Sequence, residues 1–326
     1  MNNDTNIIAV KLPDIKSKIY LLLKLIIAFS LIVYLVYYVQ SKNIIDTFSN
    51  ANFSLLLLSL MLLFPNIYLQ YWKWKLTCEQ LISEKRKKKV LLSLFYGFPA
   101  AIFTPARTGE YFGRGMAFKD RAFTEIVLAT FIDKFFTVIV TFFMGTASAI
   151  LFVNKYYHSN NLISLPLLIV FLFISVFTLA IMFSNKEWLS KFLSPLLKYK
   201  VFAQISKKIL MVKNLNRAYV IKMLSLSMIF LLCYVLQFMI LIAAFSHHFD
   251  LLIYFWAAIL IMFAKSVLSP LSISELGVRE AASVFFLTQI GETSSIALNA
   301  SLAIFIINII IPSLIGLFFL FVKNDD

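Results

Sequence analysis

The chain has 326 residues, of which 61% are apolar and only 14% are charged, and it contains 34 phenylalanines. Soluble domains average about 45–50% apolar and about 25% charged residues, so this composition excludes ordinary soluble, disordered and collagen-like proteins. The 30 lysines and arginines exceed the 16 acidic residues and give a formal net charge of +14. This charge lies between long apolar runs, which favours loops beside an anionic membrane over a nucleic-acid surface. We predict an all-α polytopic membrane protein that forms one integral membrane domain over residues 1–326.

Six apolar segments are long enough to cross about 30 Å of hydrocarbon as helices. They cover residues 19–40, 53–72, 125–153, 162–184, 219–245 and 296–322 approximately. Two further apolar stretches, 90–104 and 252–269, are shorter or run directly into polar clusters. The N-terminal region lacks the pattern of a cleaved signal peptide, so the first span is expected to be retained.

Basic residues gather at the N-terminus, from Lys73 to Lys89 and from Lys186 to Arg217. The positive-inside rule predicts that these three regions face the cytoplasm from the inner cell membrane, with both termini cytoplasmic. The segment of about 90–124 must then start and finish on the cytoplasmic side. The segment of about 252–292 must start and finish outside. Each is therefore predicted to be a re-entrant helical hairpin, and the two enter from opposite faces.

The basic segment of about 185–218 alternates lysine with apolar residues at helical spacing. This pattern predicts an amphipathic helix on the cytoplasmic leaflet, and an ordinary basic loop is the alternative.

The two predicted hairpins carry matching motifs. FPAAIFTPARTGEYFGR (98–114) aligns with FAKSVLSPLSISELGVR (263–279) when Pro105 is placed over Pro270. A hydroxyl residue precedes each proline, a glutamate follows at five positions and an arginine at nine. The matched charges are Glu110 with Glu275 and Arg114 with Arg279. The match predicts an internal, inverted repeat, the general layout of many transporters.

Serine or threonine followed by proline is a helix-start signal, so each motif predicts a helix that begins at its hairpin tip. Free N–H groups at such a start suit a phosphate or a carboxylate. Glutamate and arginine four residues apart share one face of that helix. The alternative is that both motifs are solvated loops with turn-forming proline and glycine. That alternative is weaker for the second motif, because a charge at bilayer depth costs about 2.5–3.5 kcal/mol.

The strings PARTGEYFGR and PLSISELGVREAA resemble the paired signatures of the lysylphosphatidylglycerol synthase membrane region, a flippase-like family. The resemblance implies a multi-span protein that handles lipid. Larger members carry a cytosolic aminoacyl transferase, whereas this chain ends at Asp326 just after its last predicted span. Lipid aminoacylation, and enzyme activity in general, is therefore not expected. Residues Ser272 to Ser274 stand where the family commonly has glycines. The flexibility of this hairpin tip and the choice of substrate are therefore not carried over from the family.

Motif residues and the resemblance together define the predicted substrate-binding set. It comprises Arg107, Gly109, Glu110, Arg114, Lys265, Ser272, Glu275, Gly277, Arg279 and Glu280, with Pro270 also matching the family signature. Arg107, Arg114 and Arg279 are predicted to contact a head-group phosphate, because a guanidinium offers a planar fork of donors and stays charged. The glutamates would hold these arginines in an empty site, or one could bind a coupling proton.

Two charges in the otherwise apolar segment of 125–153, Asp133 and Lys134, are predicted to support the site. Asp133 could reach a motif arginine; the alternative is that both side chains reach interfacial water. No catalytic residue, metal site or cofactor is predicted, and no nucleotide-binding or hydrolase motif is present.

Three functions fit these observations. The leading hypothesis is a lipid transporter that binds an anionic phospholipid or lipid-linked phosphate in a charged cavity and moves it between leaflets. A membrane-embedded transferase on a lipid-linked sugar or phosphate, with Glu110 or Glu280 as base, is a second. A non-catalytic partner of a separate lipid-modifying enzyme is a third. Assembly as a homo-oligomer or with such an enzyme stays open.

Overall fold

The fold comes from a computed structural model, which describes residue 37 and residues 41–102, 104, 107–157, 166–167, 169–172, 217–268 and 277–322. Throughout these residues the chain forms helices joined by turns and loops, without a strand. In chain order the helices are α2 (Ser41–Ser49), α3 (Phe53–Met61), α4 (Leu63–Leu81), α5 (Lys87–Ile102), α6 (Gly109–Gly115), α7 (Phe123–Tyr156), α11 (Arg217–Ser246), α12 (Leu251–Leu268), α13 (Val278–Gln289), α14 (Ser294–Phe305), the π-helix η3 (Ile306–Ile310) and α15 (Ile311–Val322). The predicted fold class, an all-α polytopic membrane protein, is confirmed.

Within the described residues, five helical stretches are long and apolar enough to cross a membrane. They are Phe53–Leu81, Phe123–Tyr156, Arg217–Ser246, Leu251–Leu268 and Ser294–Phe321. Four of them correspond to predicted spans. The fifth is α12, which corresponds to the stretch predicted to open the second re-entrant hairpin; its 18 residues measure about 27 Å at 1.5 Å per residue. The predicted spans at 19–40 and 162–184, and the basic segment of 185–218, lie largely outside the described residues.

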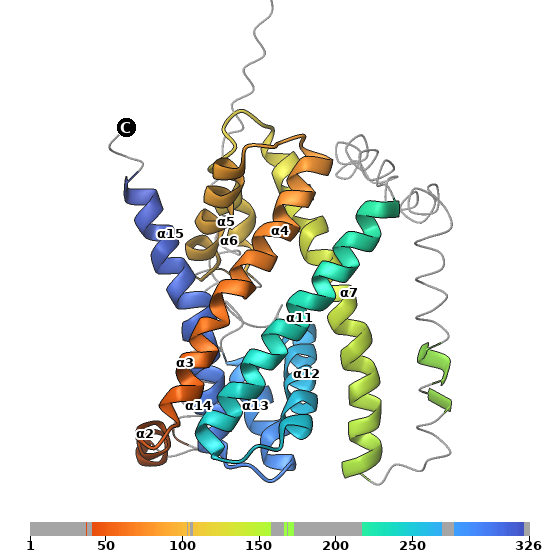
Figure 1. The fold of residues 1–326 in the computed structure, drawn as a ribbon. Helices are drawn as coiled ribbons and strands as arrows, with labels where there is room; N and C mark the ends of the chain where they lie inside the picture. Colours follow the sequence, from red (N-terminus) through yellow and green to blue (C-terminus); the bar gives the residue numbers. More distant parts are fainter. Residues whose placement is uncertain are drawn as a thin grey trace, which may run out of the picture.

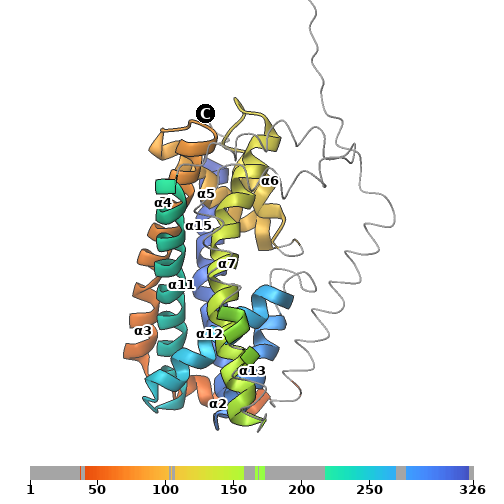
Figure 2. The same ribbon diagram turned by 90° about the vertical axis from the view of Figure 1, so that its right-hand side faces the viewer.

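Two helical hairpins enter the bundle from opposite ends, as Figure 1 shows. α5 descends from the upper end and α6 returns toward it, while α12 rises from the lower end and α13 returns. The two helices of each hairpin pack against each other. After a quarter turn, Figure 2 shows α7 running past both hairpins, with α6 toward its upper part and α13 toward its lower part. The middle of the bundle is therefore the place where the two hairpins approach each other.

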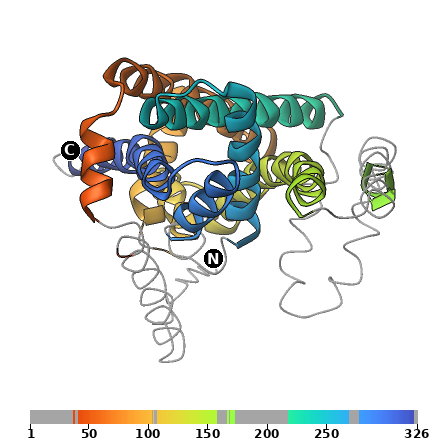
Figure 3. The same ribbon diagram turned by 90° about the horizontal axis from the view of Figure 1, so that it is seen from below.

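The two halves of the chain repeat the same order of elements in opposite directions. A long helix, a hairpin and a second long helix occur as α3–α4, α5–α6 and α7, and again as α11, α12–α13 and α14–α15. Contacts between the halves obey the same correspondence. The first helix of each hairpin packs on the last long helix of the other half: α5 packs on α15, and its counterpart α12 packs on α7. Viewed from below, the blue helices of the second half lie over the ochre helices of the first hairpin (Figure 3). This arrangement is an inverted repeat, in which α4 packs directly on its counterpart α11.

Both helical interruptions in this bundle lie close to prolines. α3 and α4 are separated at Leu62, three residues before Pro65, whose ring nitrogen cannot donate the normal backbone hydrogen bond. Just before Pro312, α14 passes into the π-helix η3. A π-helix inserts an extra residue into the turn and changes the direction of the side chains that follow. Asn308 lies in this π-helix and donates a hydrogen bond to Gln237 on α11.

At the upper end, four charged side chains join the α4–α5 connection and the first turn of α5 to the α6–α7 connection. The Arg86 guanidinium donates two hydrogen bonds to the Glu84 carboxylate, at 2.9 and 2.8 Å, and also pairs with Asp120 at 3.0 Å. Lys89 pairs with both carboxylates. The hydrogen bonds from Arg86 lower the pKa of Glu84 to about 2. Those from Lys89 and Arg86 lower the pKa of Asp120 to about 2.

A Glu84→Gln variant should therefore have a lower thermal midpoint than wild type, by an amount that shrinks in acid. The folded pKa of Glu84 is depressed, so its contribution is complete above the unfolded pKa of about 4.3 and is lost as the pH falls through about 2. The difference in midpoint, measured in detergent, should be constant near neutral pH and narrow below about pH 5. Glu79→Gln, which breaks a partly exposed pair with Lys75, should change little at any pH. A Glu84 difference independent of pH would contradict this account.

Candidate functional site

The hairpins meet at a pocket of about 360 Å³ in the middle of the bundle. Its walls come from α4, α6, α7, α11, α12 and η3, together with Arg107 just before α6. Charged side chains are its main chemical feature: it is lined by the cations Lys73, Arg107, Arg114, Lys134 and Lys265 and by the carboxylates Glu110 and Asp133. Among the described lining residues, positive charges therefore exceed negative charges by three.

Glu110 is the hub of the first hairpin's charges. Arg114 Nη2 donates to Glu110 Oε1 at 2.6 Å, and Lys134 Nζ donates to Oε2 at 2.6 Å. Arg107 Nη2 lies 3.4 Å from Oε2. Glu110 is 4% exposed, so one buried carboxylate stands between three cations. Charge-assisted hydrogen bonds of this kind fix the positions of all four side chains.

Asp133 connects the hairpin to the spanning helices α7 and α4. Arg114 Nη1 donates to Asp133 Oδ2 at 2.9 Å, so Asp133 does reach a motif arginine. On the other side Lys73 Nζ lies 3.8 Å from Asp133 Oδ1, and it donates to the Asp133 carbonyl and to Thr137 Oγ1. Asp133 is 4% exposed, so the alternative of contact with interfacial water is wrong for this residue.

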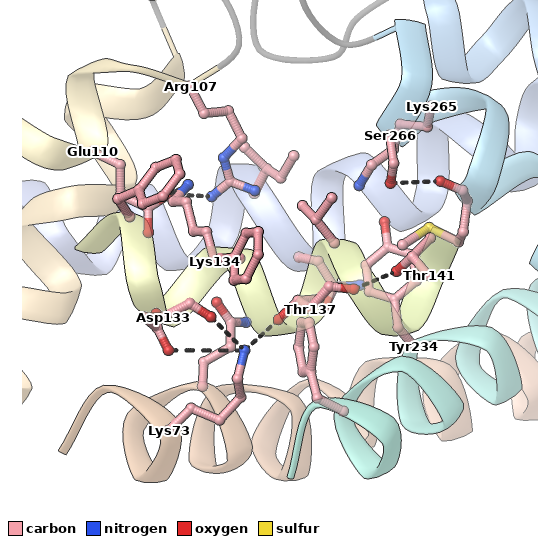
Figure 4. A pocket seen from close by; sticks show the side chains of 18 of the residues that line it. Lys73, Arg107, Glu110, Asp133, Lys134, Thr137, Thr141, Tyr234, Lys265 and Ser266 are labelled. Carbon is pink, nitrogen blue, oxygen red and sulfur yellow. Dashed lines mark hydrogen bonds and ion pairs between the residues drawn. The ribbon is translucent and has the colours of Figure 1, made fainter. Parts of the chain in front are cut away.

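Lys73 was predicted to belong to a cytoplasmic basic region, and this prediction is wrong. α4 continues to Leu81, which puts Lys73 eight residues, or about 12 Å, inside the helix end. Its side chain is nearly fully buried and points into the pocket from α4 (Figure 4). One feature of the sequence indicates that Lys73 is inside a helix. Apolar and helix-forming residues continue after Lys73 and separate it from the ERKKK cluster.

Figure 4 shows that the pocket has two charged ends. Arg107, Glu110 and Lys134 lie at one end, Lys265 lies with Ser266 at the other, and α7 runs along the pocket from the first end to the second. Aromatic side chains accompany the cations: the Arg114 guanidinium lies 4.3 Å from the Trp74 ring centroid, and Lys265 Nζ lies 5.4 Å from that of Tyr234. Cation–π contacts of this kind stabilise charge in a site with little water.

A buried amide cluster borders the pocket and was not found from the sequence. Asn66 Nδ2 donates to Gln237 Oε1 at 2.6 Å, and Asn308 Nδ2 donates to the same oxygen at 2.8 Å. These residues come from α4, α11 and η3, and Asn308 also lines the pocket. An uncharged amide within an apolar helix gives only a weak sequence signal, and no motif links three positions so far apart in the chain.

The predicted substrate-binding residues divide into three groups. Arg107, Glu110, Arg114 and Lys265 line the pocket, as do the supporting residues Asp133 and Lys134. Gly109, Gly277, Arg279 and Glu280 are not among the lining residues. Ser272 and Glu275, with Pro270, lie outside the described residues.

Gly109 has a packing role. A Cβ atom at this position would lie 1.9 Å from the carbonyl oxygen of Ala100, so only glycine allows α6 to approach α5 this closely. Gly277 has a φ of +83°, in the region that favours glycine, and it immediately precedes α13. Both glycines therefore shape the hairpins whose charged residues form the site.

The helix starts differ from the prediction of a helix beginning at the motif proline. α6 begins at Gly109, four residues after Pro105, and the Thr104 hydroxyl accepts a hydrogen bond from the Gly109 N–H at 2.7 Å. Arg107 occupies the loop before this start with a φ of +56°, which is strained for a residue with a side chain. The hydroxyl thus satisfies a backbone donor at the helix start as predicted, but the helix begins later than predicted, and Arg107 lines the pocket from the turn before it.

Arg279 is fully buried and is bonded to its own half of the repeat. It pairs with the adjacent Glu280, and its Nε donates to Ser301 Oγ on α14 at 3.0 Å. Glu280 Oε2 accepts a hydrogen bond from the Gly277 N–H at 2.7 Å. Arg114 makes the corresponding contact from its hairpin to Asp133 on α7. The two motif arginines therefore attach each hairpin to the long helix that follows it.

Burial also decides between the two readings of the motifs. Glu110 and Arg114 are 4% and 2% exposed, and Arg279 and Glu280 are 0% exposed within the protein itself. The alternative in which the motifs are solvated loops is therefore wrong for these four residues. No group of three or more histidine, cysteine, aspartate or glutamate side chains suited to a metal ion occurs in the part of the chain that the structure describes.

Long apolar helices, an inverted repeat and a basic pocket inside the bundle together describe a polytopic membrane protein with a charged internal pocket. The model of the family described as lysylphosphatidylglycerol synthase TM region matches residues 21–316, and the chain belongs to this family. No curated protein and no solved structure matches the chain significantly.

Proposed function

We propose that this protein is a lipid transporter that binds an anionic lipid head group in the central pocket and moves it between leaflets. The observation that carries the proposal is the excess of positive charge in a pocket at the meeting point of two inverted hairpins. Uncompensated charge is costly at bilayer depth, so a site built this way favours a ligand of opposite charge. Family membership supports a role in lipid modification or transport.

The contacts of Glu110 suggest how the head group enters. Glu110 pairs with Arg107, Arg114 and Lys134, the cations that a phosphate would use. Lys134 and Arg107 are the more exposed of the three, with side chains 28% and 18% exposed. An arriving phosphate would take over these two donors, while Arg114 stays bonded between Glu110 and Asp133. Acyl chains would remain in the surrounding lipid. Movement of one half of the repeat against the other would then open the pocket to each side in turn.

Lys134→Gln should slow lipid movement by about tenfold, because a charge-assisted hydrogen bond contributes about 1.5–3 kcal/mol and 1.4 kcal/mol corresponds to a factor of ten. The assay is scrambling of fluorescent phosphatidylglycerol, cardiolipin and polyprenyl phosphate in reconstituted liposomes. Lys155→Gln is the matched control, since Lys155 is on the same helix but lies beside Tyr156 and Trp256, away from the pocket. Its activity should equal that of wild type.

Movement no faster than in empty vesicles for every lipid would overturn the transport proposal. Equal rates for wild type and Lys134→Gln would overturn the role of the pocket. Release of a modified lipid, or activity that appears only when a separate lipid-modifying enzyme is added, would favour the transferase or the accessory-protein hypothesis instead.

We further propose that the upper end of the bundle faces the cytoplasm, because the lysines around 85–89 gather there. A cysteine at Lys88 and one at Gln289, both exposed positions, should then react with an impermeant maleimide from opposite sides of the inner membrane. Replacing the native Cys78 and Cys233 with alanine removes background labelling. Labelling of both positions from the same side would contradict this orientation of the hairpins.

A further inference from the structure

The charge of the pocket constrains which lipid fits it. Five cations and two carboxylates line it, and all seven belong to described residues. If Glu275, outside those residues, also faced the pocket, an excess of two positive charges would remain. A head group with a single negative charge therefore leaves a positive excess in the pocket, whereas one with two or three negative charges offsets most or all of it.

The two carboxylates of the pocket pair unequally with its cations. Arg114 and Lys73 are held by the two carboxylates, with side chains 3% and 5% exposed. Arg107 and Lys134 both pair with Glu110 Oε2, and Arg107 Nε has no hydrogen-bond partner among the residues that the structure describes. Lys134 has three N–H donors, and one of them is used by Glu110. Donors for an anion are thus concentrated at the Arg107 and Lys134 end.

Lys265 contributes a further positive charge at the opposite end of the pocket (Figure 4). It is on the second hairpin, while Arg107 belongs to the first. An anion in this pocket therefore experiences a basic residue from each half of the repeat. A terminal phosphate presents oxygens in several directions, whereas a phosphodiester is covered by substituents on two sides.

We infer that the lipid carries a phosphomonoester or a diphosphate, an inference that rests on the proposed function and narrows its substrate. A phosphomonoester carries a charge of about −1.5 to −2 at neutral pH, compared with −1 for the phosphodiester of phosphatidylglycerol. An aminoacylated head group is the least suitable, since the two ammonium groups of a lysyl ester outweigh its phosphate and meet a basic pocket. The inferred substrate thus differs from the lipid in the family's descriptive name.

The test is binding of lipids with identical acyl chains to the full chain in detergent, measured by native mass spectrometry and titration calorimetry. The probes are phosphatidic acid, phosphatidylglycerol and lysylphosphatidylglycerol, with polyprenyl phosphate and diphosphate as further ligands. At pH about 7.5, phosphatidic acid should bind at least about tenfold more tightly than phosphatidylglycerol, and the lysyl lipid should bind most weakly. The preference should fall at pH about 5.5, because the second phosphate pKa is about 6.

Variants separate pocket charge from other causes of selectivity. Lys134→Gln and Lys265→Gln should each reduce the preference for phosphatidic acid by about threefold to tenfold, while Lys155→Gln should leave it unchanged. Equal affinity for the three lipids, or tightest binding of the lysyl lipid, would overturn the inference. If phosphatidylglycerol is nevertheless moved across liposome membranes, the proposed function survives that result. If no lipid is bound or moved, the proposed function fails as well.

Discussion

Replacing Asp133 with asparagine should lower the free energy of unfolding by about 3–5 kcal/mol, the largest stability effect expected for a single charge in this protein. The Asp133 carboxylate is the only partner that joins Arg114 and Lys73 among the described residues, at 2.9 and 3.8 Å. Without it, Lys73 loses its carboxylate and Arg114 keeps only Glu110. A buried charge that loses its partner costs more than the pair contributed, because desolvation is no longer offset.

A double-mutant cycle tests this account. Lys73→Met alone leaves Asp133 with Arg114, and combined with Asp133→Asn it removes the charge that the single variant leaves uncompensated. We expect the double variant to be less destabilised than the sum of the two single variants by at least about 1 kcal/mol. The measurement is reversible unfolding in mixed detergent micelles. Asp46→Asn, at an exposed position of α2, is the matched control and should change stability by less than about 0.5 kcal/mol. A loss of less than about 1 kcal/mol for Asp133→Asn would contradict the network.

The hairpins could be predicted because two independent signals agreed. The basic clusters predicted which loops lie on the same side of the membrane, and the apolar stretches between them had the wrong parity for full crossings. The repeated Pro–Glu–Arg spacing then indicated that the two irregular segments were related. Neither signal depends on side-chain contacts, so both can be recognised from a single sequence. The same reasoning correctly brought Glu110, Arg114 and Asp133 to one place.

The symmetry of the motif was, however, a poor guide to the role of Arg279. Sequence spacing makes Arg279 the equivalent of Arg114, but the helices that follow the two hairpins differ. Arg114 pairs with an aspartate on α7, whereas Arg279 donates a hydrogen bond to Ser301 on α14. Its neighbour Glu280 supplies the negative charge instead. Pairing with an adjacent residue keeps Arg279 within its own half of the repeat. Such a difference depends on which side chain a neighbouring helix presents, and the motif alone does not contain that information.

Lys73 and the amide cluster illustrate a second limit. Lys73 stands close in sequence to the ERKKK run, so charge counting grouped it with a loop, although helix length separates them in space. Asn66, Gln237 and Asn308 are brought together by the crossing of α4 with α11 and by the π-helix η3. The position of a π-helix cannot be deduced from periodicity, because a single inserted residue changes which face a side chain occupies.

Replacing Gly109 with alanine should abolish head-group binding and destabilise the first hairpin. The added Cβ would lie 1.9 Å from the carbonyl oxygen of Ala100 and 2.8 Å from Thr104 Oγ1. Backbone cannot move aside as the end of a flexible side chain can, so α6 must shift away from α5. Overpacking typically costs about 1–3 kcal/mol, and a backbone clash belongs at the upper end of that range. Arg107, two residues before Gly109, and Glu110, directly after it, would leave their positions in the pocket.

Gly115→Ala is the matched control for this prediction, because it makes the same substitution in the same short helix. Its Cβ would lie 3.1 Å from the Phe123 ring, a side chain that can adjust by a few tenths of an ångström. We therefore expect Gly115→Ala to bind phosphatidic acid with close to wild-type affinity and Gly109→Ala to show no binding at the highest lipid concentration tested. Thermal midpoints of both variants in detergent separate loss of the site from loss of the fold. Unchanged binding by a folded Gly109→Ala protein would mean that the close contact of α5 with α6 does not position the charges, and the pocket would then have to form by other contacts.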